Sequence, residues 1–418
     1  MMSMDNQDIE SKTVGCFKTK LSLLWMNLSS EPLIAIYSLM PIILRKELGA
    51  TTFQIALFST LSPVLSVLSF YWGSWLTIRK NQLLFNLIGS WILARIPFLF
   101  FPYIDTFWMM FACCSVYQLF SRASTPALME ILKRNIPKKT REYVFSLYYA
   151  LSVLEGILIG FLLTQFLTVS DNNWRLLFLI CALISFTSVF IQLQIKIPMK
   201  KEEDPVPDPS KNKLTQPLKE SFRLLQSRPD FALFQWGFMI GGFALMLISP
   251  VRSIFIADLL PVSIADITTA RCVFVGLGMA GSSLIWRKAL EIYGIHRLTA
   301  WILIGFGFYP LFLLLASVHI SWFYLAHLAY GIAQGGSHLV WHLSGTIFAG
   351  DQNSAPFTTI NVLMIGLRGL VGPLLGGLLC YALGPIPVLI LGSMIGLSGG
   401  WLMLRLKSNT THSTNEYL

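Results

Sequence analysis

The features of this sequence that could do chemistry are ionisable side chains in the middle of long apolar stretches. They comprise two glutamates and five arginines: Glu31, Glu155, Arg95, Arg122, Arg252, Arg271 and Arg368. A charge at the centre of a bilayer costs ~2.5–3.5 kcal/mol on insertion scales, so it needs a partner, water or a bound ligand. A carboxyl group in such a place can carry a proton, and a guanidinium can bind an anion.

Glu31 and Arg122 each lie close to a proline within their stretches. Glu31 directly precedes Pro32, and a proline there frees a backbone carbonyl and bends the helix. We expect Glu31 either to carry a proton or contact a ligand, or to form a structural ion pair with an arginine of a neighbouring helix. Arg122 stands four residues before Pro126, among small polar residues that indicate a hydrated face.

The remaining charges leave alternatives open. Arg252 follows Pro250 near one end of its stretch, so its side chain could instead extend to the membrane surface. Arg368 is flanked by glycines that let another helix approach, and it is expected either to bind a ligand or to pair with an acid such as Glu155. Arg95 and Arg271 lie nearer stretch ends, or on stretches that could face lipid, and stay outside the predicted site.

Residues 331–342 form an unusual apolar stretch with polar side chains at helical spacing. Its polar and aromatic residues recur at i, i+4, i+7 and i+8, which places them on one helical face: Gln334, His338, Trp341 and His342. Two histidines at i, i+4 could bind a metal, but no acidic third ligand is near, so no metal is predicted. We expect a hydrogen-bonding or proton-responsive face.

Composition determines the class of protein that must position these residues. Of the 418 residues, 54% are hydrophobic and only 12% charged, and the mean hydropathy is +0.63. A soluble chain could not hide so much apolar surface behind so few charges. The continuous apolar runs predict an all-α polytopic membrane protein rather than a β-barrel.

Hydropathy predicts twelve membrane spans in two sets of six. They are expected at 22–44, 53–76, 83–104, 107–132, 143–168, 174–195, 230–260, 266–290, 296–317, 320–350, 357–383 and 385–406. One long polar, proline-rich run separates the sets. The predicted domains are therefore an N-terminal six-helix bundle at 1–195, a linker at 196–229 and a C-terminal six-helix bundle at 230–418.

Basic residues are distributed asymmetrically among the predicted loops. With both termini inside, the cytoplasmic segments hold 23 lysines and arginines and the outer loops hold 3. This bias predicts cytoplasmic termini and a cytoplasmic linker. It also explains the net charge of +10 through anionic lipid headgroups, without a nucleic-acid partner. Within the linker, residues 218–228 predict a short amphipathic helix on the inner leaflet, with Leu218, Phe222 and Leu225 on one face.

Twelve spans around a long central loop resemble the major facilitator superfamily. The loop between spans 2 and 3 reads GSWLTIRKN from Gly73, of which only that glycine matches the family motif G-x-L-x-D-R-x-G-R-R. The loop between spans 8 and 9 keeps an acid, a glycine and a base, namely Glu291, Gly294 and Arg297. Span 11 contains Gly372 and Pro373 in a G-P-x-x-G-G core, similar to a motif that drug exporters of the family carry in span 5. The resemblance also extends to uncharacterised bacterial members.

The resemblance implies a membrane transporter with a site near the midplane between two pseudo-symmetric halves. It places spans 1, 4, 7 and 10 around the cavity, with spans 2, 5, 8 and 11 beside them. The candidate substrate-binding residues on those spans are Glu31, Arg122, Glu155, Arg252, Gln334, His338, Trp341, His342 and Arg368. The candidate gating or structural residues are Pro32, Gly73, Glu291, Gly294, Arg297, Gly372 and Pro373.

The predicted function is secondary transport by alternating access of a small organic anion or zwitterion, coupled to protons. The alternative is efflux of hydrophobic or cationic compounds, for which Glu31 and Glu155 would be the key charges. A transport-inactive receptor and a lipid-acting membrane enzyme are the other hypotheses. No G-x-S-x-G, H-E-x-x-H or G-x-x-x-x-G-K-[ST] motif favours enzymatic or ATP-driven chemistry. We expect a monomer without cofactors in a bacterial inner membrane.

Overall fold

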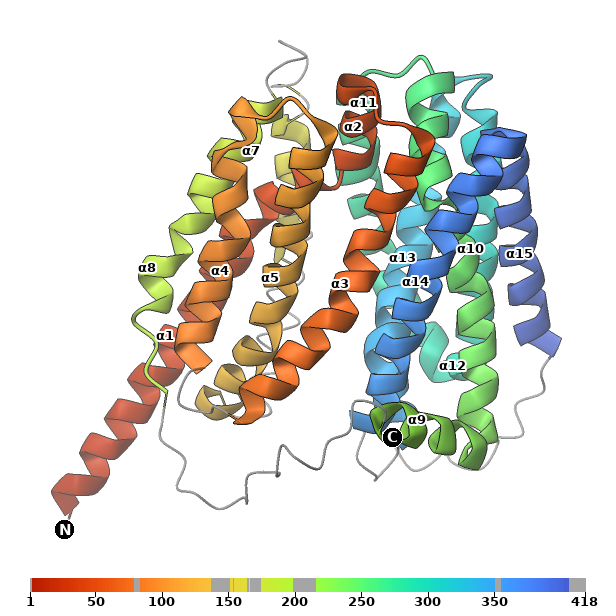
Figure 1. Ribbon diagram of the computed structural model, residues 1–418. Coiled ribbons are helices and arrows are strands. Elements are labelled where there is room, and N and C mark those ends of the chain that lie inside the picture. Colours follow the sequence, from red (N-terminus) through yellow and green to blue (C-terminus); the bar gives the residue numbers. More distant parts are fainter. Residues whose placement is uncertain are drawn as a thin grey trace. The chain divides into compact units, whose positions relative to one another are not determined.

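A computed structural model describes residues 2–78, 83–136, 151–152, 154–163, 165, 174–197, 216–349 and 355–405. Within these ranges the chain is helical and contains no strand (Figure 1). This confirms the all-α fold class.

The helices of the first part of the chain overlap the predicted spans, but the first helix begins at Met2 rather than at residue 22. They are α1 (Met2–Tyr37), α2 (Met40–Leu48), α3 (Thr52–Ile78), α4 (Leu83–Leu99), the 3₁₀ turn η2 (Phe101–Tyr103), α5 (Phe107–Asn135), the helix Leu154–Leu163, α7 (Trp174–Phe186) and α8 (Ser188–Gln192).

The second part begins with the linker helix and continues through the remaining spans. Its elements are α9 (Gln216–Ser227), α10 (Pro229–Leu259), α11 (Ile264–Thr268), the π-helix η5 (Thr269–Phe274), α12 (Val275–Leu315), α13 (Ile320–Ala349), α14 (Ala355–Leu383) and α15 (Pro385–Arg405).

Six helices among the described residues are long and apolar enough to cross a membrane, or seven if the bent pair α1–α2 forms one span. The segment Ile264–Leu315 is a single such helix by length, although two spans are predicted there. Its backbone turns at Gly294, whose φ of 73° is unfavourable for residues with a side chain. Two spans therefore meet at this glycine without an intervening loop.

The helix of the first span continues through Pro32 and ends at Tyr37. A bend of 41° follows between Tyr37 and Met40, where α2 begins. Proline at position 32 therefore lies inside α1, and the break in the span comes after it.

The chain forms two compact units. Unit 1 contains Met1–Met40, Leu65–Pro209 and Ile264–Cys272; unit 2 contains Pro41–Val64, Ser210–Ser263 and Val273–Leu418. Each unit includes a segment from the other half of the sequence. The predicted domain boundaries at 195 and 230 remain a prediction.

Aromatic rings from four helices form much of the core of unit 1. Phe98 of α4 stacks on Phe178 of α7 with centroids 5.4 Å apart, and Tyr117 of α5 lies 5.0 Å from Phe98. Tyr37 of α1 meets Phe98 edge-on at 6.3 Å. Such pairs add about 0.5–1.5 kcal/mol beyond area burial and fix the packing of α1, α4, α5 and α7.

An aromatic cluster also joins α10, α13 and α14 in unit 2. Phe234 lies 5.0 Å from Phe348, and Phe231 lies 5.0 Å from Phe357. Elsewhere along α10 and α14, glycines allow the two helix backbones to come into contact. A side chain at Gly376 would overlap the backbone of Leu247, so α14 and α10 need glycine there.

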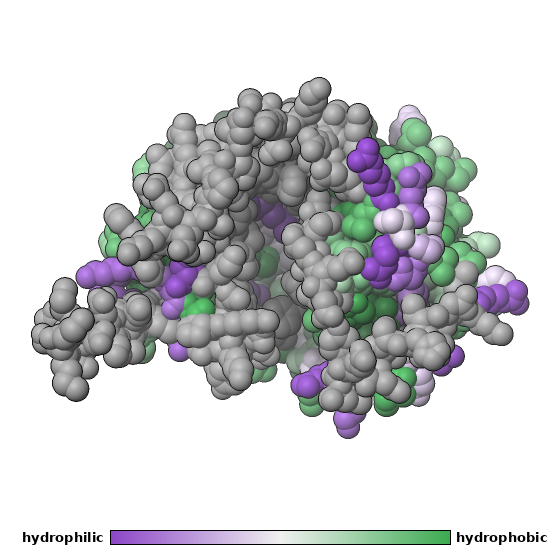
Figure 2. All heavy atoms as spheres, turned by 90° about the horizontal axis from the view of Figure 1, so that it is seen from below, coloured by the Kyte–Doolittle hydropathy of each residue, from purple (hydrophilic) through white to green (hydrophobic). Residues whose placement is uncertain are grey.

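The linker helix α9 lies across the lower ends of α10 and α14 in Figure 1. Leu224 and Leu225 pack against the core of unit 2, whereas Phe222 is 63% exposed. The linker therefore contains a helix at Gln216–Ser227, in which Phe222 and Leu225, expected on one face, have different surroundings. In the view from this end, hydrophilic and hydrophobic residues of the described part of the chain lie next to one another at the right-hand side (Figure 2).

Candidate functional site

The buried arginine of α14 stands out in unit 2. Arg368 is 7% exposed, and its Nη1 donates a hydrogen bond to the carbonyl oxygen of Phe238 on α10 at 2.7 Å. The guanidinium carbon lies 4.5 Å from the centroid of the Phe238 ring. A side chain at Gly242, one turn further along α10, would overlap the guanidinium. Glycine at this position makes room for the charge.

The charge of Arg368 is only partly compensated. Its Nε is buried and has no hydrogen-bond partner among the described residues. Arg368 also forms no ion pair with any described acid of unit 2. Glu155, the acid considered in the sequence, belongs to unit 1, so that pairing stays a prediction. A buried cation with an unused donor is well suited to bind an anion.

The polar face predicted on α13 reaches this arginine through Phe238. Trp341 stacks on Phe238 with centroids 6.2 Å apart and an interplanar angle of 17°. One turn away, the side chains of Gln334 and His338 interact at 3.1 Å between Nε2 atoms. Because Gln334 donates from its amide, the imidazole Nε2 accepts in this arrangement. The His342 side chain lies outside the described residues.

A buried polar network that joins α10, α13 and α14 in unit 2 was not predicted from the sequence. Gln235 on α10 donates to Asn361 Oδ1 on α14, and Asn361 Nδ2 donates to Ser344 Oγ on α13 at 2.9 Å. Gln235 is 3% exposed, and its Oε1 has no hydrogen-bond donor in the part of the chain described. Uncharged polar residues in apolar spans are the signal that would have found them.

Arg252 belongs to a different cluster of unit 2. Its guanidinium carbon lies 5.8 Å from the ring centroids of both Tyr309 and Tyr330. At 1.5 Å per residue, Arg252 is roughly 20 Å from Phe238 along α10. The fold therefore does not place Arg252 beside Arg368, although the sequence grouped both in one site.

The two predicted glutamates approach each other in unit 1. The Glu31 carboxyl interacts electrostatically with Glu155 and packs against Gly156, where an added Cβ would lie 2.9 Å from Glu31 Oε1. Glu155 Oε2 is buried and accepts no hydrogen bond from any described residue. Neither acid forms an ion pair within the described ranges. Two neighbouring carboxyl groups of this kind can take up and release a proton.

The arginines of unit 1 have contrasting surroundings. Arg122 is exposed in the middle of α5, where it interacts electrostatically with Tyr117. Arg95 is 4% exposed and donates to Ser185 Oγ at 3.0 Å, Ser30 Oγ at 3.2 Å and the Trp91 carbonyl at 3.4 Å. The hydrogen bonds of Arg95 make it a cross-link between α4, α1 and α7.

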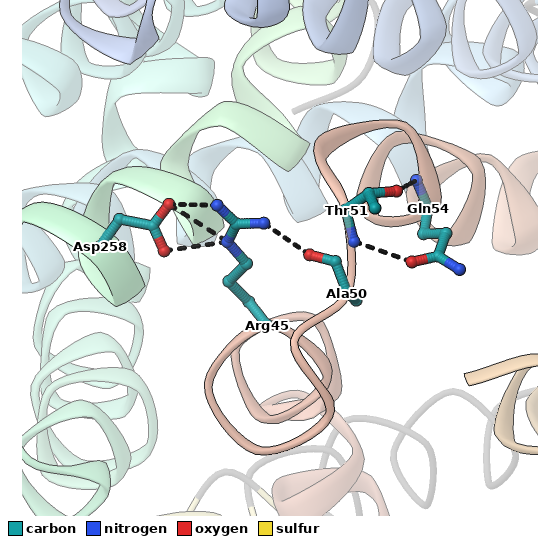
Figure 3. Close-up of polar contacts among 5 residues, drawn as sticks. All are labelled: Arg45, Ala50, Thr51, Gln54 and Asp258. Atoms are coloured by element: carbon teal, nitrogen blue, oxygen red, sulfur yellow. Dashed lines mark hydrogen bonds and ion pairs between the residues drawn. The ribbon is translucent and has the colours of Figure 1, made fainter. Parts of the chain in front are cut away.

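An ion pair in unit 2 joins segments that are far apart in the sequence (Figure 3). Arg45 of α2 binds Asp258 of α10 through Nε at 2.9 Å and Nη2 at 2.5 Å, and its Nη1 donates to the Ala50 carbonyl at 2.6 Å. Lys46 Nζ donates to the Val262 carbonyl at 2.5 Å. We call these contacts the Arg45–Asp258 latch.

The start of α3, next to the latch, is capped reciprocally. Thr51 N–H donates to Gln54 Oε1 at 2.8 Å, and Gln54 N–H donates to Thr51 Oγ1 at 3.2 Å (Figure 3). This capping box fixes the short turn that presents the Ala50 carbonyl to Arg45.

The predicted gating residues have varied surroundings. Glu291 pairs with Arg287 at 3.3 Å, whereas Arg297 is exposed and pairs with no acid among the described residues. Gly372 of α14 faces Met246, with an added Cβ 2.8 Å from the Met246 Cβ, and Pro373 lies inside the same helix. Gly73 lies in α3, and its surroundings fall outside the described residues.

Comparison with known proteins gives this architecture a family. A search of curated proteins found no match. A POT family transporter in complex with 5-aminolevulinic acid is similar in structure, with 13% identity, a TM-score of 0.71, and coverage of 93% of this chain and 95% of the other.

Two further transporters show the same fold. A mutant form of the nucleoside transporter NupG has 12% identity and a TM-score of 0.68, covering 92% of this chain and 99% of its own. A D-xylose-proton symporter has 11% identity and a TM-score of 0.64, covering 93% and 97%. The sequence model of the Major Facilitator Superfamily matches residues 33–353, so this chain is a multi-pass membrane protein that belongs to that superfamily.

Proposed function

We propose that this protein is a secondary transporter that moves a small organic anion or zwitterion by alternating access, coupled to protons. The family and its structural neighbours support transport as the general activity. The observation that carries the substrate class is Arg368, a buried cation without an acidic partner among the described residues.

The surroundings of Arg368 define how a substrate would be held. Its Nε supplies an unused donor for a carboxylate or phosphate, and the Phe238 and Trp341 rings supply flat apolar contact surface. His338 and Gln334 add polar groups on the α13 face that carries Trp341. A substrate that combines a negative charge with an apolar or planar part matches these groups.

Proton coupling is assigned to Glu31 and Glu155. Both acids lack an ion-pair partner within the described ranges, and they interact with each other. A proton on one of them reduces the repulsion between the pair. One protein of similar structure is a D-xylose-proton symporter, so proton-driven transport is compatible with this fold.

The Arg45–Asp258 latch gives the transport cycle a gate. It joins the first two predicted spans to the seventh, near loops that the basic-residue bias places outside the cell. An alternating-access cycle needs contacts at this end that break and reform. We assign the latch this role, with both termini in the cytoplasm of a bacterial inner membrane and the monomer as the working unit.

The alternative function is efflux of hydrophobic or cationic compounds. The Glu31–Glu155 pair favours it, because two acids without a basic partner in the described part of the chain could bind a cation. In that case Arg368 would not contact the substrate. The two functions therefore assign substrate recognition to opposite charges in different units.

Thermal unfolding of the detergent-purified protein with a ligand panel distinguishes the two functions. The panel contains organic anions, amino acids, sugars, nucleotides and lipophilic cations, each at pH 6 and pH 8. A ligand at 100 times its Kd should add about 2.7 kcal/mol of stability. Anions are expected to stabilise the parent and an Arg405→Gln control, but not Arg368→Gln.

The opposite pattern would support efflux. Stabilisation only by lipophilic cations, retained in Arg368→Gln and lost in Glu31→Gln, would overturn the assignment of an anionic substrate. Arg405 is a suitable control because it lies at the end of α15, where its guanidinium is 3.7 Å from the Trp401 ring centroid.

A further inference from the structure

An apolar cavity of ≈ 370 Å³ lies between α12 and α13 in unit 2, away from the Arg368 cluster. Its lining includes Gly281, Ile285, Trp301 and Ile332. Almost all of the lining surface is apolar, and one side of the cavity is open. A volume in this range is typical of ligand pockets.

The cavity has a structural origin in the helix packing. At one end Gly278 and Gly331 bring the α12 and α13 backbones together, since a side chain on Gly278 would overlap the Leu328 carbonyl. Further along, an added Cβ at Gly281 would have no atom within 4 Å. The helices therefore touch at the glycine pair and leave a space beside Gly281.

Two tryptophans mark the end of the cavity nearest the Gly294 turn. Trp286 donates through Nε1 to the Ile332 carbonyl at 2.7 Å, so its indole is fixed. Trp301 packs against Tyr293 with centroids 4.8 Å apart. Tryptophan and tyrosine are enriched where a membrane span meets the headgroup region. This end of the cavity is therefore expected at the headgroup level.

Basic side chains lie at the Gly294 end of the cavity on both helical segments. Lys288 follows the lining residue Ile285 by three positions, and Arg297 precedes Trp301 by four, so each shares a helix face with a lining residue. Both are exposed, and neither has an acidic partner in the described ranges. The nearby Arg287 is already paired with Glu291 at 3.3 Å.

We propose that this cavity is a binding site for an anionic glycerophospholipid. One acyl chain fills the space beside Gly281, and the phosphate binds Lys288 and Arg297. The occupant is a lipid rather than the transported solute, because the lining offers almost no polar surface and the two cations stand at the cavity end marked by tryptophans. Each such cation near a membrane surface contributes ~1 kcal/mol to binding of anionic lipid.

Two variants separate the two parts of the proposed site. Gly281→Leu fills the cavity, and Gly89→Leu in α4 is the matched control because its added side chain also has open space at Cβ. Lys288→Gln with Arg297→Gln removes the phosphate ligands. Lys18→Gln with Lys20→Gln removes the same charge elsewhere on the predicted cytoplasmic side.

Lipid retention by native mass spectrometry provides the readout, with phosphatidylglycerol or phosphatidylcholine added to the delipidated full-length protein. The parent and both controls should retain phosphatidylglycerol in preference to phosphatidylcholine. Gly281→Leu should lose retention of both lipids. The Lys288/Arg297 variant should bind phosphatidylglycerol about tenfold or more weakly, and its preference should disappear.

Other outcomes overturn the proposal. Equal retention of phosphatidylglycerol by the parent and Gly281→Leu would place the lipid elsewhere. Equal losses in the Lys288/Arg297 and Lys18/Lys20 variants would show a general charge effect. Binding of the parent to both lipids without preference would exclude the phosphate contact. Each variant is first checked for a thermal unfolding transition like that of the parent, and Lys288→Gln alone replaces the double variant if that one does not fold.

Discussion

Arg95 and Arg368 are both buried arginines in membrane spans, but their hydrogen bonding differs. Arg95 is 4% exposed, makes three hydrogen bonds to described residues and lies 3.5 Å from the Trp91 ring centroid. Arg368 is 7% exposed, makes one hydrogen bond and leaves Nε without a partner among the described residues. Burial alone does not distinguish a structural cation from a ligand-binding one, whereas unused donors do.

The largest expected effect is on ligand affinity at Arg368. Replacement by Met removes the charge and keeps much of the volume, so the bound anion loses its counter-charge and affinity should fall at least about thirtyfold. Stability without ligand should stay unchanged or rise, because an uncompensated buried charge is removed. Ligand titrations and thermal unfolding measure both. A marked loss of ligand-free stability would make Arg368 structural like Arg95.

The same substitution at Arg95 should act on stability instead. Arg95→Met breaks the hydrogen bonds to Ser30 and Ser185 and leaves both hydroxyls buried, so unfolding should become easier by about 2 kcal/mol. Ligand affinity, measured on the fraction that remains folded, should not change. A variant as stable as the parent but unable to bind ligand would reverse the roles of the two arginines.

A substitution of Glu31 tests whether the difference between compensated and uncompensated buried charges also holds for acids. Like Arg368, Glu31 has no ion-pair partner in the described part of the chain, so we expect a functional role. In proteoliposomes with a one-unit pH gradient, one coupled proton supports up to about tenfold solute accumulation. Glu31→Gln should abolish this accumulation and leave exchange without a gradient. Glu31→Asp serves as the conservative control, and accumulation that survives in Glu31→Gln would exclude Glu31 from coupling.

The smallest effect on stability is expected at the Arg45–Asp258 latch. The pair is partly exposed, with 25% and 34% of the two side chains accessible, so its coupling energy should be at most about 1 kcal/mol. A double-mutant cycle with Arg45→Gln and Asp258→Asn measures this energy. If the latch is also a gate, both single variants should change the transport rate more than this small stability change implies. Unchanged rates would leave it a simple structural contact.

Much of the fold could be predicted because membrane spans follow from local composition. The span predicted at 385–406 corresponds to Pro385–Arg405, and the linker helix predicted at 218–228 corresponds to Gln216–Ser227. Each requires only a run of about twenty apolar residues or an amphipathic period. The tight turn at Gly294 was harder to predict, because a single non-helical glycine replaces the expected loop between two spans.

The candidate site was less predictable because it depends on contacts between distant residues. Gln235 and Asn361 are 126 positions apart, and their pairing across α10 and α14 has no sequence signal. Arg252 and Arg368 looked equivalent as charges in spans. Their positions along the packed helices put one beside Tyr309 and Tyr330 and the other beside Phe238.

The sequence by itself determined that this protein is helical, lies in a membrane and carries a few costly charges inside its spans. These properties follow from hydropathy, which acts on neighbouring residues along the chain. Only the tertiary structure decided which charges are compensated. Hydroxyls from α1 and α7 reach Arg95, whereas Arg368 meets one carbonyl and a ring. The electrostatic energy of a buried charge depends on the groups around it in space, and folding brings those groups from distant parts of the chain.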